Sequence, residues 1–289
     1  MSKNLLVSIC IPTFNQTFFL TKTLDSIVEQ TYKDFEVIVS DDSTNYEVEK
    51  LLESYKNRLW INYTKNSKPL GSPANWNNLV KNAKGDLIKF MHHDDWFENC
   101  NSLANFVKVF QNHENCNFAF CSSKILNVEK DIFTFNQPNN QFLIELEKNP
   151  KILFNNNLIG SPSAIIYRKN NDYFDEKLKY LVDVDFYMRL LQRNNSFIYL
   201  QEALIVNTSN HVNQVTASSL NKKTQLGEYC YLYNKIYNGS LTGLKWSTFF
   251  IDLFRKYNVV KIEDLNDIGC EVPRPNLYFR LLIFLSTKL

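Results

Sequence analysis

The sequence predicts an α/β fold in which a mostly parallel central sheet is flanked by helices and followed by a mainly helical C-terminal extension. Three observations predict it. Short, nearly continuous apolar runs are typical of strands buried on both faces. Apolar residues recur at helical spacing between these runs. Strand and helix patterns alternate over the first hundred residues, as in a parallel sheet covered on both faces.

The elements follow one another in a regular order at the start of the chain. Leu5 to Ile11 is a short, nearly continuous apolar run closed by Pro12, and it predicts the first strand. In chain order the patterns predict strands at 5–11, 35–39, 59–63 and 87–91, separated by helices at 20–28, 48–55 and 75–83. The middle is less regular, with strands at 118–120, 164–167 and 197–206, a polar loop at 136–141 and a helix at 186–191. We expect a catalytic domain at 1–215 and the helical extension at 216–289.

Composition excludes several classes of protein. The 289 residues carry 32 basic and 30 acidic side chains, a net charge of +2, and 44% are hydrophobic. Nucleic-acid binding usually needs a strongly basic surface, so no nucleic-acid partner is expected. The six cysteines form no C-x-x-C pair, the chain starts without a secretory leader, and no apolar run reaches the ~18 residues of a membrane span. We therefore expect reduced thiols and a cytoplasmic protein.

Polar residues follow three of the predicted strands. The first strand is followed by Pro12, Thr13, Phe14 and Asn15, the second by Asp41 and Asp42, and the fourth by His92, His93, Asp94 and Asp95. Because sheets of this class bind ligands at the carboxyl ends of their strands, these loops should converge on one crevice.

The chain lacks a glycine cradle for phosphate. It has only 7 glycines and neither G-x-G-x-x-G nor a P-loop motif. Mg²⁺ or Mn²⁺ on Asp94 and Asp95 would supply the counter-charge for a diphosphate, since these hard cations prefer oxygen ligands. Alternatively, the two aspartates only cap a strand in a solvated turn. Their place after a buried strand, beside two histidines and Trp96, favours the metal.

Four segments resemble family 2 glycosyltransferases. Residues 7–15, 24–32 and 35–43 resemble the opening of that family, and residues 84–95 resemble its segment with the D-x-D metal motif. The resemblance implies a GT-A fold, a nucleotide-sugar donor and inversion at the anomeric carbon. It covers residues 5 to 100 closely, and extends more loosely as far as His211.

The resemblance also implies roles for individual residues. Contacts to the donor nucleotide are implied at Pro12, Thr13, Phe14, Asn15, Asp41, Asp42, Asn77 and Asp94. Phe14 would lie against the base, and Asp42 or Asp41 would meet the base edge or the ribose. Asp95 would be the principal metal ligand, helped by Asp94, while His211 would bind metal or phosphate unless it is an ordinary loop histidine. His93 stands at the first D-x-D position, and Trp76 stands where many relatives have Arg, so that contact would be absent or come from Lys81.

The catalytic base is implied further along the chain. Inversion needs a carboxylate that takes the proton of the attacking hydroxyl. Residues 182–190 resemble the family's E-D-x-D…R segment with Val182 in place of Glu, which implies Asp183 as the base. Alternatively, Asp183 and Asp185 are simply first-turn residues of a helix; Asp185 is expected to cap that helix and to pair with Arg189. Ser161 and Ser163 fall where relatives shape the acceptor pocket, with a structural turn as the alternative.

The C-terminal segment 275–285 is apolar and aromatic, with Arg280 inside it and Lys288 after it. It is too short to span a bilayer but suits peripheral contact with the inner face of the cell membrane. Alternatively, it docks on the catalytic domain or on a second subunit of an oligomer.

These expectations define one function. They indicate an inverting, metal-dependent glycosyltransferase of the hexosyl- or N-acetylhexosaminyltransferase class, with a UDP-sugar as the favoured donor. The acceptor would be a hydroxyl of a glycan or lipid-linked oligosaccharide in bacterial surface polysaccharide synthesis, either lipopolysaccharide or capsule. A sugar nucleotidyltransferase would need a glycine-rich basic loop after the first strand, which this chain lacks. The remaining alternative is a non-catalytic carbohydrate-binding or scaffold protein, which hydrolysis of a donor would exclude.

Overall fold

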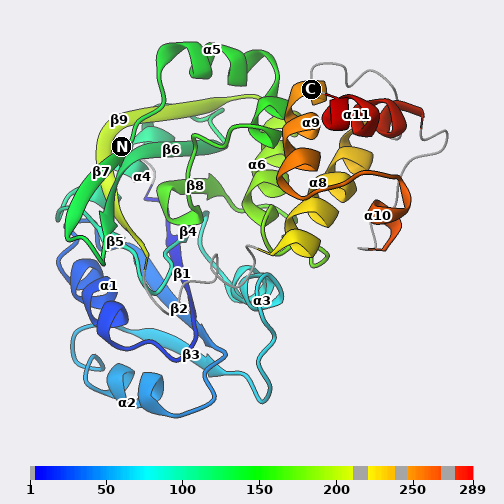
Figure 1. Cartoon of the computed structure of the whole chain (residues 1–289). Coiled ribbons are helices and arrows are strands. Elements are labelled where there is room, and N and C mark those ends of the chain that lie inside the picture. Colours follow the sequence, from blue (N-terminus) through cyan, green and yellow to red (C-terminus); the bar gives the residue numbers. More distant parts are fainter. Residues whose placement is uncertain (1–3, 211–220, 238–245, 268–276, 289) are drawn as a thin grey trace.

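The computed structural model describes residues 4–210, 221–237, 246–267 and 277–288 (Figure 1). They form a nine-stranded sheet in the order β3-β2-β1-β4-β8-β6-β9-β5, with β7 paired to the side of β6. The pairings orient β1, β2, β3, β4, β6 and β9 in one direction and β5, β7 and β8 in the other. The mostly parallel sheet is confirmed.

The first hundred residues form the predicted alternating unit. Its parallel strands are β1 (Val7–Thr13), β2 (Phe35–Asp41), β3 (Ile61–Lys65) and β4 (Leu87–Phe90), and its helices are α1 (Phe18–Val28), α2 (Glu47–Glu53) and α3 (Ala74–Asn82). Every residue of β1 is buried. Val7, Ile9 and Ile11 belong to one hydrophobic cluster and Cys10 to the other, as expected when successive side chains of a strand point to opposite faces.

Gly85 joins this unit tightly at the turn before β4. Its amide donates to Ser8 Oγ at 2.8 Å, and a Cβ at this position would lie 2.6 Å from the Ser8 amide nitrogen. No larger residue fits without moving β1, which explains why glycine stands at this position.

The middle of the chain adds more elements than the sequence patterns predicted. They are β5 (Trp96–Phe97), α4 (Ser102–Asn112), β6 (Phe118–Asn127), β7 (Ile132–Asn136), α5 (Asn140–Lys148), the 3₁₀ turns η1 (Pro150–Phe154) and η2 (Pro162–Ala164), β8 (Ile165–Arg168), α6 (Val182–Arg193) and β9 (Phe197–Ser209). The prediction of a polar loop at 136–141 was wrong at both ends, because these ends belong to β7 and α5. Asn136 ends β7, and Asn139 caps α5 by accepting a hydrogen bond from the Phe142 amide at 2.8 Å.

The extension is helical, as predicted, in its described parts. It contains α8 (Lys222–Tyr237), α9 (Ser247–Lys256), α10 (Glu263–Asn266) and α11 (Leu277–Lys288), which gather beside α6 in Figure 1. Phe154 of η1 packs against five aromatic rings of the extension, with centroids 5.3 to 6.4 Å apart: Tyr229, Tyr233, Trp246, Phe249 and Phe250. The extension thus shares one hydrophobic cluster with α3, α6 and the sheet.

Candidate active site

A cavity of about 730 Å³ opens at the carboxyl ends of the parallel strands, where the sequence placed the crevice. The loops after β1, β2 and β4 line it, and the end of β9 lies directly on the turn after β4. The turn before α6 and residue Tyr229 of α8 complete the wall. Its wall includes Pro12, Thr13, Phe14, Asp42, Asn75, Trp76, His92, His93, Asp94, Asp95, Asn157, Ser161, Asp183, Asn207, Thr208 and Tyr229.

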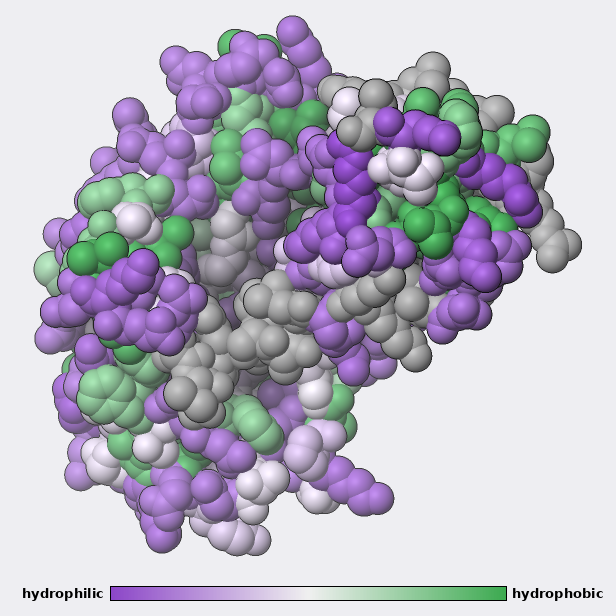
Figure 2. Space-filling model, viewed as in Figure 1, coloured by the Kyte–Doolittle hydropathy of each residue, from purple (hydrophilic) through white to green (hydrophobic). Residues whose placement is uncertain are grey.

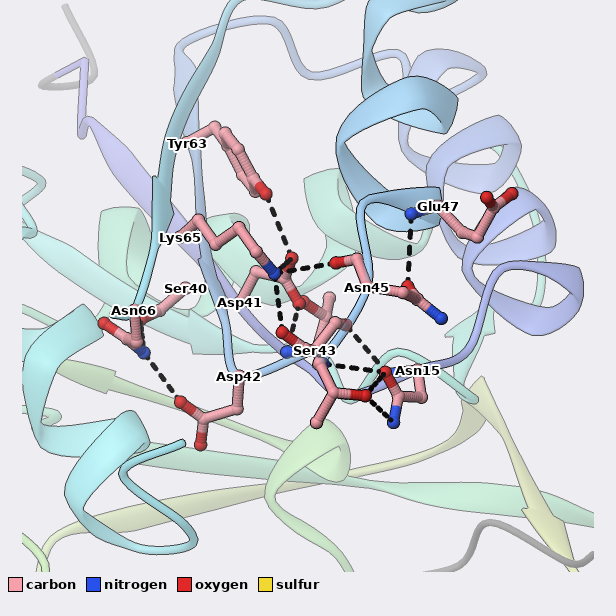
Figure 3. A network of polar contacts seen from close by, with 12 residues as sticks. Asn15, Ser40, Asp41, Asp42, Ser43, Asn45, Glu47, Tyr63, Lys65 and Asn66 are labelled. Atoms are coloured by element: carbon pink, nitrogen blue, oxygen red, sulfur yellow. Dashed lines mark hydrogen bonds and ion pairs between the residues drawn. The ribbon is translucent and has the colours of Figure 1, made fainter. Parts of the chain in front are cut away.

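Asp42 lies in this wall and organises a neighbouring strip of chain. Only 4% of the residue is exposed. Its carboxylate accepts a hydrogen bond from Asn66 Nδ2 at 2.8 Å (Figure 3). It also accepts from the Leu70 amide at 3.0 Å and the Gly71 amide at 2.8 Å. Asp42 therefore fixes the loop that forms this edge of the cavity.

Asp41 is outside the cavity lining and is fully engaged within the protein. Thr13 Oγ1 at 3.0 Å and the Ser43 amide at 2.8 Å donate to one carboxylate oxygen, and Tyr63 OH at 3.0 Å donates to the other, with Lys65 Nζ at 3.5 Å (Figure 3). It joins β1, β2 and β3 below the cavity floor.

Asn15 and Asn77 also stand behind the lining. Asn15 has a positive φ of 46° and ties the loop after β1 to that after β2 through Ser43 and Thr44. Asn77 is buried and exchanges two hydrogen bonds, of 2.8 and 3.0 Å, with the backbone of Phe174. In this part of the wall the cavity is lined by Asn75 and Trp76, which precede Asn77 in α3.

The turn after β4 is held from three elements. Thr23 Oγ1 of α1 donates to the Asp95 carbonyl at 2.7 Å, and the His92 amide donates to Ser163 Oγ at 2.9 Å. The Thr208 amide of β9 donates to Asp95 Oδ1 at 3.2 Å. These contacts bring His92, Asp94 and Asp95 together, each offering one ligand atom within 4.8 Å of the others.

The two histidines of this turn have different environments. His93 is 7% exposed, and its Nδ1 lies 3.1 Å from the Pro12 carbonyl, so this nitrogen is the donor. His92 packs against Trp76, with ring centroids 5.1 Å apart, and its Nδ1 is 4.0 Å from Asp95 Oδ2. Burial lowers the pKa of His92 to about 4, so its imidazole is neutral near pH 7.

This group of side chains fits a divalent cation. Burial, followed by the charge of Asp94, raises the pKa of Asp95 to about 7, so the two carboxylates lack a sufficient counter-charge of their own. Two carboxylates and a neutral imidazole form a donor set suited to Mn²⁺ or Mg²⁺. The sequence placed His93 in the motif, whereas the structure brings His92 beside the carboxylates. His211, the other expected ligand, lies outside the described residues.

Lys89 was not singled out in the sequence. It is fully buried in β4, and its ammonium donates to the carbonyls of Phe90, at 2.8 Å, and of Ser163. Burial lowers its pKa to about 7. The sequence signal that could have identified it was a lysine inside the apolar run Leu87–Phe90. Lys89 holds η2 against the turn after β4.

Asp183 lines the opposite side of the cavity, in the first turn of α6. Asn157 Nδ2 donates to its Oδ2 at 2.9 Å, and the Val184 amide donates to its Oδ1 at 2.9 Å. Burial raises the pKa of this carboxyl to about 6. A carboxylate with that pKa is ionised near pH 7 and is a stronger base than an ordinary aspartate.

Asp185 serves the structure of α6. It pairs with Arg189 Nε at 2.9 Å, as expected, and with Lys235 Nζ of α8 at 2.7 Å. Its expected capping role is wrong, because Leu181 occupies the N-cap.

The two serines near the acceptor side are placed differently. Ser161 lines the cavity and its Oγ accepts from Asn207 Nδ2 at 2.8 Å. Ser163 lies behind it, fully buried.

Comparisons with known proteins identify the family of this chain. The family described as Glycosyl transferase family 2 matches residues 8–174. An uncharacterised glycosyltransferase of Rickettsia typhi is 27% identical over 89% of this chain and 82% of its own length. Poly(ribitol-phosphate) beta-N-acetylglucosaminyltransferase TarS of Staphylococcus aureus is 28% identical over 68% of this chain, but the match spans only 34% of TarS.

Solved structures share the fold. The crystal structure of Staphylococcus aureus TarS in complex with UDP-GlcNAc has a TM-score of 0.65 at 22% identity, covering 89% of this chain and 77% of that one. A mannosyltransferase of Pyrobaculum calidifontis in complex with GDP-Man and Mn²⁺ has a TM-score of 0.57 at 14% identity, covering 99% and 86%. The fold is thus of the GT-A type expected from the resemblance. This chain is a glycosyltransferase and belongs to Glycosyl transferase family 2.

Proposed function

We propose that this glycosyltransferase is inverting and depends on a divalent cation, and that it moves a hexosyl or N-acetylhexosaminyl group from a UDP-sugar to a hydroxyl of a glycan or lipid-linked acceptor. One observation carries the proposal. Asp42, the group of His92, Asp94 and Asp95, and Asp183 all line the same cavity. We assign this chemistry to residues 1–215, with 216–289 as a helical extension packed on them, and its biological role to bacterial surface polysaccharide synthesis.

The donor would occupy the side formed by the loops after β1 and β2. Phe14 is 44% exposed and offers a ring face to the base, and Asp42 offers its carboxylate edge to the base or ribose. Asp41, Asn15 and Asn77 would act on the donor indirectly, by fixing this wall. The UDP-GlcNAc complex of the structurally similar TarS supports a UDP-sugar as donor.

The leaving diphosphate would lie near Asp94 and Asp95. These carboxylates, with His92, would hold the cation, which when bound neutralises charge on the diphosphate. Thr23, Ser163 and Thr208 keep the three side chains in place by the contacts described above.

Asp183 would act as the base. The acceptor hydroxyl oxygen forms a bond to the anomeric carbon as the bond to the diphosphate oxygen breaks on the opposite face, which inverts the configuration. The hydroxyl proton passes to the Asp183 carboxylate, and the electron pair of the broken bond leaves with the nucleoside diphosphate. Ser161 lines the same cavity and would contact the acceptor.

A lipid-linked acceptor would require contact with a membrane surface, and α11 supplies a suitable face. Leu277, Leu281 and Phe284 are each more than half exposed, and Arg280 and Lys288 share that exposed side. Figure 2 shows hydrophobic residues among hydrophilic ones at this end of the molecule. No described helix has the length and apolar character needed to cross a membrane. We propose that α11 rests on anionic lipid, to be tested by co-sedimentation with vesicles with and without phosphatidylglycerol.

Ligand-dependent thermal stability tests the donor site. UDP at a hundredfold its dissociation constant should stabilise the protein by ~2.7 kcal/mol, or roughly 5 to 10 °C in melting temperature. The shift should require Mn²⁺ and disappear in Asp95→Asn but persist in Asp34→Asn, a change at an exposed aspartate. A metal-independent shift, or one that Asp95→Asn retains, would refute the proposed metal site. Transfer or hydrolysis of the UDP-sugar by the wild type then tests catalysis.

A further inference from the structure

A carboxylate from the extension binds the turn that leads to Asp183. Glu228 of α8 is 7% exposed and lies behind the cavity wall. Its Oε1 accepts from the Lys179 amide at 2.7 Å, and its Oε2 accepts from the amides of Tyr180 and Leu181, both at 2.8 Å. Three successive amides thus surround one buried carboxylate, and charge-assisted hydrogen bonds of this kind offset the cost of burying it.

The bound turn, residues 179–181, leads into α6 and ends at its N-cap. Leu181 is the N-cap residue, makes no side-chain capping bond, and stands two positions before Asp183. The first amides of a helix have no partner within the helix and need an acceptor from elsewhere. Glu228 supplies that acceptor for the Leu181 amide at the N-cap and also binds the two amides before it, and its negative charge suits the positive end of the helix dipole.

Further contacts hold α8 against the same region. Tyr231 OH donates to Asp175 Oδ2 at 2.8 Å, and Lys235 Nζ lies 2.7 Å from both Asp175 and Asp185. The next residue after Glu228, Tyr229, reaches the cavity wall. Of these contacts, the Lys235–Asp185 ion pair joins α8 directly to α6, two residues after Asp183.

We propose that Glu228 is a positioning residue for catalysis: by binding the amides of residues 179–181, it holds the first turn of α6 so that the Asp183 carboxylate faces the acceptor hydroxyl. This inference rests on the proposed function of Asp183 as the base. It makes the helical extension a necessary part of the acceptor side.

The charge of Glu228 provides a signature that a purely structural role would not. After burial, Glu228 adds to the forces that raise the pKa of Asp183. Besides Glu228, the side chains of the described residues that interact with Asp183 are Asn157, Tyr187 and Tyr229, which are all uncharged near pH 7. Removing the charge of Glu228 should therefore lower the pKa of the base.

The test compares Glu228→Gln with Tyr231→Phe, which removes a different α8 contact and leaves the 179–181 turn intact. We expect Glu228→Gln to lower kcat roughly 10- to 100-fold, since small displacements of a catalytic group have effects of this size, with an unchanged KM for the donor. The acidic limb of its kcat/KM profile should move to lower pH. Tyr231→Phe should keep both the wild-type kcat and the wild-type limb. Equal losses in the two variants without a pH shift would overturn the proposal.

Amide hydrogen exchange gives a readout that needs no activity. In Glu228→Gln the amides of 179–181 should exchange faster while those of β1 stay unchanged; unchanged exchange at 179–181 overturns the proposal even if no donor is ever turned over. Absence of turnover in the wild type would instead count against the proposed function. If Glu228→Gln does not fold, Glu228→Asp keeps the charge but shortens the side chain. A kcat equal to that of Tyr231→Phe would then refute the positioning role, and a tenfold lower kcat would support it.

Discussion

Replacing Asp183 by Asn separates what this carboxylate does for catalysis from what it costs in stability. The amide has nearly the same shape, and the Asn157 side chain can rotate its amide to keep a hydrogen bond. Loss of the base should reduce kcat by roughly 10² to 10⁴. In the wild type, a base with a pKa of about 6 should give a kcat/KM about tenfold below its plateau at pH 5.

The stability effect has the opposite sign. The pKa of Asp183 rises from 3.8 to about 6 on folding, so the folded protein binds this proton more tightly than the unfolded chain does. Ionisation therefore costs stability as pH rises from about 4 to 6, and the full cost persists above pH 6. Two pKa units correspond to ~3 kcal/mol, an upper bound because the side chain is partly exposed. Asp183→Asn should therefore be more stable than wild type at pH 8 by about 1–3 kcal/mol, or roughly 2 to 10 °C.

Differential scanning fluorimetry from pH 4 to pH 8 measures this difference. The two melting temperatures should converge near pH 4, where the wild-type carboxyl is protonated. The exposed Asp34→Asn change serves as the control and should follow the wild type throughout. An Asp183→Asn variant no more stable than wild type at pH 8, or a wild-type activity limb near pH 4, would refute the reasoning.

Two further predictions address the donor side. His92→Asp replaces an imidazole nitrogen by oxygen beside Asp94 and Asp95, so the affinity for Mg²⁺ relative to Mn²⁺ should rise about tenfold. Competition of Mg²⁺ against Mn²⁺, followed by electron paramagnetic resonance, measures this ratio. An unchanged ratio would exclude His92 as a ligand. Asn77→Ala leaves the buried backbone groups of Phe174 unpaired, so it should lower the free energy of unfolding, measured in urea, by about 2–4 kcal/mol. Its affinity for UDP should stay within about twofold of wild type. A stable variant with weak UDP binding would instead place Asn77 in contact with the donor.

The alternating first half of the fold was predictable because strand and helix spacings differ and each element is strongly apolar. The end of the first strand, at Pro12, was predicted less accurately. Pro12 was expected to end the first strand, yet β1 continues to Thr13. The last β1 residue paired with β4 is Cys10, so the missing amide of Pro12 breaks no ladder there.

The missed elements of the middle region have two different explanations. Helix α4 carried a clear signal, since Leu103, Phe106, Val107 and Phe110 are all buried and follow helical spacing. Strand β7 gave no usable alternation, because all of Ile132, Phe133 and Phe135 are exposed. It is positioned by pairing with β6, a contact that local sequence does not encode.

The site was predictable as a set of loops but not as a set of side chains. In two adjacent pairs, the sequence could not tell which member faces the cavity: Asp42 does and Asp41 does not, and Trp76 does while Asn77 does not. Both His92 and His93 line it, but only His92 stands beside the carboxylates. Strand pleat and helix rotation decide these outcomes, and they depend on packing throughout the sheet. Glu228 was invisible to motif reasoning because its partners are backbone amides almost fifty positions away.

Phe154 limits how this enzyme can be re-engineered. Its ring is enclosed by five aromatic side chains contributed by the extension. The extension therefore cannot be exchanged without breaking the packing around Phe154. A chimaera that kept residues 1–215 and received the tail of another glycosyltransferase would leave a large apolar surface without its partners. Grafting a tail to change acceptor choice would therefore require exchanging η1 together with α8 and α9, as one unit of design.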